Sequence, residues 1–134
     1  MTNGFGDGEF AFQAWETPFE NSAIELITVE YCGEDGALHF RVRTREPDSV
    51  YRISFEHVSA FRVLDEHGLP ELWEKSSEMG GRPARTTFKI RNHLWTKESI
   101  LSFATSDGWS YVVASDFECI EIVTATMPSI TLET

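Results

Sequence analysis

The sequence predicts a mainly β protein, an antiparallel β-sandwich or open barrel of about eight short strands with one short helix near residues 69–76. Two features support this prediction. Several short segments alternate between apolar and polar side chains, which is typical of strands that bury one face. Turn-forming sequences such as GEDG, EPDS and DG separate these segments. An α+β arrangement, with a helix packed on one face of a sheet, is the alternative.

The clearest local pattern is a hairpin in the segment ITVEYC-GEDG-ALHFRVR. With Gly33–Gly36 as the loop, Cys32 pairs with Ala37, Val29 with Phe40, and Ile27 with Val42. This register gathers the apolar residues on one face. A slip of one residue would move them to the other face, so the pattern specifies the register strongly.

The following sequence extends this hairpin into a three-stranded meander over Ile24 to Glu56. Taking Glu46–Ser49 as the loop pairs Phe40 with Phe55 and places Arg43 opposite Arg52 on the back of the sheet. The residues expected to be buried together on the front are Val29, Tyr31, Phe40, Val42, Ile53 and Phe55.

The rest of the chain alternates between further strands and turns. Pro70 suits a first helical turn, and Leu69, Leu72 and Trp73 share a helical face, which predicts the helix near 69–76. Residues 96–105 fit either a helix or a strand, and Asp107-Gly108 predicts a two-residue hairpin turn. The segments HVSAFRVLD, ARTTFKIRN, WSYVVAS and SDFECIEIVTA read as strands, and MPSITLET as an edge strand or a tail. No linker or repeat divides the chain, so we expect a single domain over 1–134.

Charge is distributed unevenly along the chain, which carries a formal net charge of −11. The first 40 residues contain eight carboxylates and no Lys or Arg, and the last 37 contain six and none. All 11 basic residues lie between Arg41 and Lys97. This charge argues against binding to nucleic acid or to anionic membranes, because both require a cationic surface.

The two cysteines, Cys32 and Cys119, are expected to be free thiols. The N-terminal MTNGFGDGEF has neither a basic region nor an apolar region, so it does not resemble a signal peptide, and no apolar run is long enough to span a membrane. These features predict a cytoplasmic protein.

No catalytic, metal-binding or cofactor-binding residues are predicted. Glu118 and Glu121 lie beside Cys119 in sequence, and nearby carboxylates raise a thiol pKa, which disfavours a nucleophilic cysteine. The four histidines are scattered, and no closely spaced pair of zinc ligands occurs. A small hydrophobic residue in a β core is the better interpretation of Cys119.

Glu121 interrupts a segment that is apolar on both faces, and such a segment is typical of a central strand. A buried carboxylate is costly unless it is paired, and arginine is its best partner. We therefore expect Glu121 to pair with an arginine of the middle segment. The stripe formed by Arg41, Arg43, Arg45 and Arg52, with Glu121, is expected to be either a set of structural ion pairs or a site for an anionic ligand.

These observations favour a non-enzymatic acidic module that binds a basic protein partner, such as an inhibitor or immunity-type protein. The alternative is a small-molecule-binding β-barrel or an enzyme with an interior pocket lined by the tryptophans. The oligomeric state is left open, and a dimer is compatible with the sequence. The carboxylates expected to face solvent and meet the partner are Glu9, Glu16, Glu20, Asp107, Asp116 and Glu118.

Overall fold

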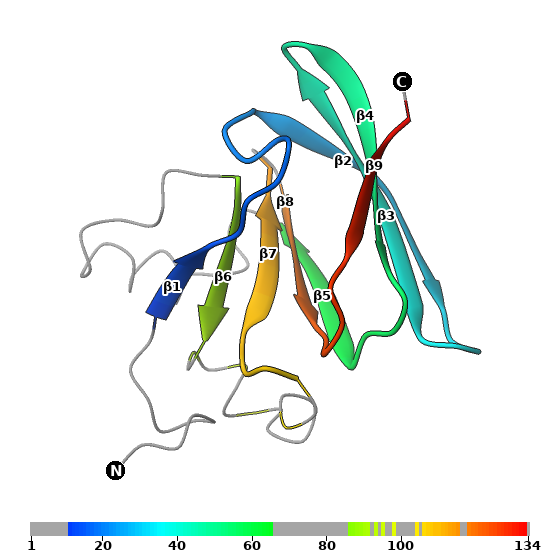
Figure 1. Ribbon diagram of the computed structural model, residues 1–134, viewed down its shortest axis with the longest axis vertical. Helices are drawn as coiled ribbons and strands as arrows, with labels where there is room; N and C mark the ends of the chain where they lie inside the picture. The colour runs from blue at the N-terminus through cyan, green and yellow to red at the C-terminus, as the bar shows by residue number, and fades with distance from the viewer. Residues whose placement is uncertain are drawn as a thin grey trace.

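The computed structural model describes residues 11–65, 86–91, 93, 95, 98, 104, 106–115 and 118–133, which form nine strands in two antiparallel sheets (Figure 1). The predicted fold class is therefore confirmed. The strands are β1 (Ala11–Ala14), β2 (Ile24–Cys32), β3 (Ala37–Arg45), β4 (Asp48–Phe55), β5 (Ala60–Asp65), β6 (Thr87–Arg91), β7 (Ser110–Ala114), β8 (Glu118–Val123) and β9 (Ser129–Leu132). The predicted helix near 69–76 lies outside the described residues, as does most of the segment 96–105.

The five-stranded sheet has the order β1-β6-β7-β8-β5, and the four-stranded sheet has the order β2-β3-β4-β9. The two sheets do not close into a barrel (Figure 1). The C-terminal segment is an edge strand, β9, which pairs with β4. Among the described residues, no helix is long and apolar enough to cross a membrane.

The first hairpin has the predicted register over most of its length. Cys32 pairs with Ala37 and Val29 with Phe40, as expected from the GEDG loop. The register shifts between Leu26 and Thr28, so that Leu26, and not the predicted Ile27, pairs with Val42. A β-bulge places one extra residue in one strand, and it leaves Ile27 exposed.

The second hairpin differs from its prediction by two residues. Its turn contains only Glu46 and Pro47, joined by a cis peptide bond, and Arg45 pairs with Asp48. Phe40 therefore pairs with Ile53, and Arg52 lies opposite Arg41 where the sequence predicted Arg43. Because side chains alternate with a period of two, this shift leaves every residue on its predicted face.

The main core lies between the two sheets. Phe40, Val42, Ile53 and Phe55 are completely buried, as predicted, and Val29 packs against them. The five-stranded sheet contributes further apolar side chains to this core, which are Tyr111, Val113, Ile120 and Ile122.

Tyr31 was predicted to lie in the core, but the structure shows that it is not fully buried. Its side chain is about half exposed, at 51%. The residue lies near the end of β2, and β2 is an edge strand of its sheet, so the core covers only part of the ring.

The opposite face of the five-stranded sheet is also apolar. Phe88, Ile90, Val112 and Cys119 form a second buried cluster there. β7 and β8 thus have both faces covered, which explains why their sequences are apolar almost throughout.

The Asp107-Gly108 turn does not connect two strands of a hairpin, which corrects the prediction. β7 pairs with β6 and β8, so the turn only precedes β7. The Trp109 N–H donates to Asp107 Oδ1 at 3.0 Å, and Gly108 has a φ of 89°, a left-handed conformation that favours glycine.

Candidate functional site

Strand β8 places Glu121 in the interior, on the face of the five-stranded sheet that is turned away from the four-stranded sheet. Ile120 and Ile122 point into the main core, so Cys119 and Glu121 lie on the opposite face. The Glu121 side chain is completely buried. A carboxylate in this position needs partners that replace the water it loses.

Arg62 and His93 supply these partners. Arg62 of β5 lies directly opposite Glu121 in the register of β5 and β8. Its Nε and Nη2 lie 2.9 and 2.7 Å from Glu121 Oε1, while His93 Nε2 lies 2.6 Å from Oε2. The Arg62 guanidinium also stacks over the Trp95 ring, 4.3 Å from its centroid. Each carboxylate oxygen therefore has a strong partner of its own.

The surroundings keep Glu121 ionised. Burial alone would raise its pKa, but the hydrogen bond and charge of His93 and the charge of Arg62 together hold the pKa below its ordinary value of 4.5. The Ser110 hydroxyl lowers this pKa further, although its buried Oγ has no hydrogen-bond partner among the described residues.

This arrangement suits a structural ion pair. Both carboxylate oxygens are engaged, and neither Glu121 nor His93 is accessible to a substrate. Cys119, on the same face, is also buried. Among the described residues, no group of three or more His, Cys, Asp or Glu side chains could hold a metal ion.

The structure separates the arginine stripe from Glu121. Arg41, Arg43 and Arg45 lie in β3 of the four-stranded sheet, whereas Glu121 lies in the other sheet. Their carboxylate partners are Glu133 for Arg41 at 3.0 Å, Asp48 for Arg43 at 3.1 Å and Glu25 for Arg45 at 4.0 Å. Arg52 has no ion-pair partner among the described residues.

The carboxylates predicted to meet a partner do not form one cluster. Glu16 and Glu20 follow β1, and Glu118 begins β8, so these residues lie toward the end of the sheet where β7 finishes. Asp107 lies at the opposite end, before β7 begins. Glu16 and Asp107 are exposed, whereas Glu20 and Glu118 are partly buried. Glu9 and Asp116 lie outside the described residues.

A different group of carboxylates is more concentrated. Glu34 and Asp35 lie in the turn after β2, Glu30 lies two residues before the end of that strand, and Glu56 follows β4. The pairing of Cys32 with Ala37 and of Leu38 with Phe55 brings these positions to one end of the four-stranded sheet. We call Glu30, Glu34, Asp35 and Glu56 the acidic end; all four are exposed, and no described Lys or Arg forms an ion pair with them.

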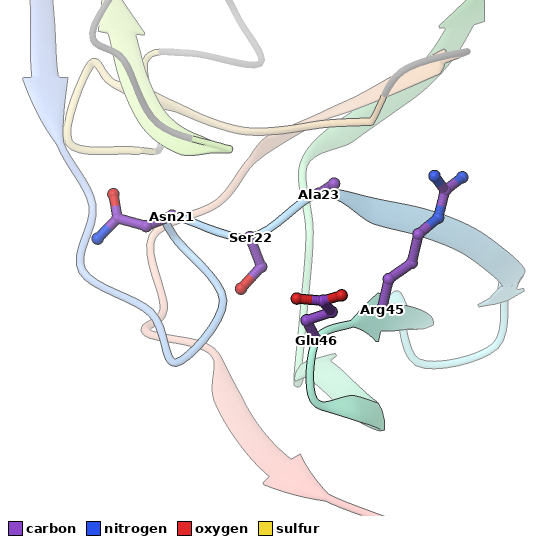
Figure 2. Close-up of a pocket in the computed structure, with 5 residues that line it drawn as sticks. All are labelled: Asn21, Ser22, Ala23, Arg45 and Glu46. Atoms are coloured by element: carbon purple, nitrogen blue, oxygen red, sulfur yellow. The ribbon is translucent and has the colours of Figure 1, made fainter.

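A cleft of about 370 Å³ lies beside the second hairpin turn (Figure 2). The residues that line it are Asn21, Ser22, Ala23, Arg45 and Glu46. In Figure 2 the Glu46 carboxylate extends toward Ser22, while the Arg45 guanidinium points away from it. The lining carries one positive and one negative charge and no aromatic ring, so it differs from the aromatic-lined pocket that the sequence suggested.

The tryptophans are also dispersed. Trp15 belongs to the main core, Trp95 stacks on Arg62, and Trp109 lies under Arg91 at 4.7 Å. Trp73 lies outside the described residues. The described tryptophans therefore fill space or stack on cations and do not line a shared cavity.

Sequence reasoning missed Arg62 and His93 as partners of Glu121. Arg62 was within reach of sequence analysis, because it lies in a segment that was predicted to be a strand. Alternation along FRVLD places Arg62 on the same face as the apolar Leu64, which marks it as an arginine directed toward apolar surroundings. His93 lies in a connection without periodicity, so no local pattern indicated its contact with β8.

Comparisons of the chain with protein-family models, with curated proteins and with solved structures give no significant match. A functional assignment therefore depends on the residues and their geometry.

Proposed function

We propose that the protein is a non-enzymatic acidic module that binds a basic protein partner, in the manner of an inhibitor or an immunity protein. The observation that carries this proposal is that the protein uses its cations internally and leaves many carboxylates uncompensated.

The described cations are almost all engaged within the protein. Arg41, Arg43, Arg45 and Arg62 form ion pairs. Lys89 lies over the Tyr111 ring at 4.9 Å and Arg91 over the Trp109 ring at 4.7 Å. Of the Lys and Arg residues that the structure describes, only Arg52 has neither an acidic nor an aromatic partner.

The exposed carboxylates, by contrast, are largely without cations. The acidic end provides four of them, and Glu16, Glu46 and Asp107 are further exposed carboxylates with no ion pair to a described Lys or Arg. Like charges repel one another and lower the stability of the folded state. A net charge of about 2–8 in magnitude suffices for the solubility of a small domain, so the formal charge of −11 exceeds that need.

A basic partner would convert this repulsion into attraction. Complementary potentials accelerate the encounter of two proteins and disfavour partners of the wrong charge. We also propose a cytoplasmic location, which Cys32 and Cys119 support because both are free thiols.

The test is capture of proteins from a native lysate on the immobilised chain, at low salt and at roughly 0.5 M salt, where the Debye length is only a few ångströms. Mass spectrometry identifies what is retained. We expect a specific protein with a net positive charge that is retained at low salt and lost at high salt. Retention of no basic protein under either condition, with a small molecule co-purifying, would instead favour the ligand-binding alternative.

A further inference from the structure

Several large apolar side chains are exposed where the two sheets meet along one side. Tyr31 is 51% exposed, Val63 44% and Ile27 41%. Tyr31 and Ile27 belong to β2, and Val63 belongs to β5. Phe61 of β5 and Val29 of β2 are partly buried and complete this apolar strip. We call these five residues the apolar seam.

The seam spans two edge strands. β2 is the outermost strand of the four-stranded sheet and β5 of the five-stranded sheet (Figure 1). The Tyr31 and Phe61 rings pack together with centroids 5.2 Å apart, which brings the two edges into contact. Phe61 and Val63 lie on the same face of β5, opposite Ile122 and Ile120 of the main core. Each of these edges has one neighbour among the described strands, so each leaves backbone N–H and C=O groups available for pairing.

Carboxylates border the seam on several sides. β2 carries Glu30, and the turn that follows it carries Glu34 and Asp35; none of these three forms an ion pair with a described Lys or Arg, whereas Glu25 of β2 is already paired with Arg45 at 4.0 Å. Asp65 ends β5.

The cations nearest to the seam are already engaged. Arg41 and Arg43, which lie across from β2, form ion pairs with Glu133 and Asp48. Arg62 of β5 is bound to Glu121 on the other face of the sheet. The surroundings of the seam therefore favour a ligand that brings its own positive charge.

We infer that the apolar seam is the docking surface for the basic partner, which binds as an extended segment along β2 with apolar side chains against Tyr31 and Val63. This inference rests on the proposed function and adds the location and the mode of binding. An added strand would pair with the edge of β2 that no described strand occupies, place alternate side chains on the seam, and bring its basic residues to the surrounding carboxylates. The carboxylates around the seam favour a basic segment over a neutral or acidic one.

A second copy of this chain is a poorer occupant of the same surface. Pairing β2 with β2 of another copy would place side by side two strands that each carry Glu25 and Glu30, and like charges on adjacent strands are destabilising. Both chains would also carry a formal net charge of −11.

The test uses synthetic peptides with the same length as β2, 9 residues. The probe alternates lysine with valine. One control alternates lysine with glycine, which keeps the charge and removes the apolar groups, and another alternates glutamate with valine. We expect the lysine–valine peptide to bind most tightly and to shift the NMR amide signals of residues 24–32 and 60–65. Binding of the lysine–glycine peptide with equal affinity, or shifts confined to other strands, would overturn the assignment.

The matched pair of variants is Tyr31→Ala and Leu132→Ala. Leu132 is 59% exposed on β9, the other edge strand of the same sheet, so both substitutions remove an exposed apolar side chain. Tyr31→Ala should weaken binding of the lysine–valine peptide by about 30-fold, the loss typical of a hot-spot residue, while Leu132→Ala should leave it unchanged. Equal effects of the two variants would contradict the inference.

The outcomes also separate this inference from the proposed function. If a basic protein is captured by the wild-type chain and binds the Tyr31→Ala variant equally well, the proposed function stands and the seam assignment fails. If no basic protein is captured, the proposed function fails, even if the lysine–valine peptide binds to the seam. If sedimentation shows a dimer of the protein that Tyr31→Ala dissociates, the seam is an interface between copies and the inference is overturned.

Discussion

The two sheets present their outer faces to very different surroundings, and each face carries arginine–carboxylate pairs. On the four-stranded sheet, the Arg43 and Asp48 side chains are 52% and 71% exposed, and the Arg41–Glu133 and Arg45–Glu25 pairs are also open to solvent. On the five-stranded sheet, Glu121 is completely buried and the Arg62 side chain is 29% exposed. The arginine is therefore in contact with solvent on both faces, whereas its carboxylate partner is accessible to water on one face and completely buried on the other.

The location of an ion pair decides its effect on the protein. Exposed ion pairs contribute little to stability, because solvent screens them and long side chains lose entropy. Breaking a buried pair is costly, because a charge remains without compensation. The exposed pairs matter instead for the surface, since each of them holds an arginine beside its own carboxylate and so away from the carboxylates of the acidic end.

Among the substitutions considered, Glu121→Ala should be the most destabilising. It leaves Arg62 and His93 without their partner, and removal of one member of a buried ion pair typically costs about 3–5 kcal/mol of unfolding free energy. Chemical denaturation of the variant and the wild type measures this loss. A cost below about 1 kcal/mol would place the Glu121 pair in the same class as the exposed pairs.

The two thiols extend the contrast between buried and exposed positions. Cys119 lies in the buried cluster beside Glu121, whereas Cys32 is exposed at the end of β2. Alkylation of native Cys119 requires an opening of the strands, so it should be slower than that of Cys32 by at least about 100-fold. Mass spectrometry during a labelling time course gives both rates. Rapid labelling of native Cys119, with loss of a measurable activity, would favour an enzyme over a binding protein.

Acid should weaken the buried pair selectively. The pKa of Glu121 in the folded protein lies below its ordinary value of 4.5, so the folded state binds this proton less readily than the unfolded state does. Its contribution to stability is fully present above the unfolded pKa and is lost as the pH falls through the folded pKa. The difference in unfolding free energy between the wild type and Glu121→Gln should therefore shrink as the pH falls from about 6 toward 3. A difference that stays constant over this range would show that Glu121 does not titrate as its surroundings imply.

On the exposed face, a comparable substitution should have little effect. Glu133→Gln removes the partner of Arg41, and a pair of this exposure contributes less than about 1 kcal/mol. The same denaturation experiment measures it, with Glu121→Gln as the comparison. If Glu133→Gln were as destabilising as Glu121→Gln, exposure would not be the property that separates the two faces.

The parts of the fold that follow from local periodicity were predictable. The alternation in ITVEYC and ALHFRVR identified the buried face of β2 and β3, and the GEDG loop determined their pairing at Cys32 and Ala37. The bulge at Ile27 was not predicted, because two adjacent apolar residues at Leu26 and Ile27 fit either register. The shorter turn at Glu46-Pro47 was missed for a related reason, since a shift by two residues preserves both faces.

The candidate site was only partly predictable. Burial of Glu121 and its pairing with an arginine of the middle segment followed from the sequence, but the partner is Arg62 and not a member of the arginine stripe. The order of strands in a sheet depends on long-range packing, and Arg62 and Glu121 are 59 residues apart in the sequence. His93 was not predictable from local pattern, because it lies in a connection without periodicity.

The acidic end was also missed, because its four carboxylates become neighbours only when β2, β3 and β4 pair. Sequence reasoning therefore identified the excess of carboxylates, but the structure was needed to locate where they gather.

The proposed role of the unpaired carboxylates can be measured with two triple variants, compared in their rate of association with the captured basic protein. Glu30→Gln, Glu34→Gln and Glu56→Gln together neutralise carboxylates of the acidic end, which form no ion pair with a described Lys or Arg. The matched control is Glu25→Gln, Asp48→Asn and Glu133→Gln, which neutralises carboxylates paired with Arg45, Arg43 and Arg41.

Both triple variants change the net charge equally, but they remove the charge at different places, and only the control also breaks ion pairs with described arginines. At roughly 0.15 M salt the Debye length is about 8 Å, so the location of a charge matters as well as the total. We expect the acidic-end variant to associate about 10-fold more slowly than the control and with a weaker dependence on salt. Equal rates for the two variants, or a wild-type rate that does not change with salt, would contradict a role for the acidic end in binding.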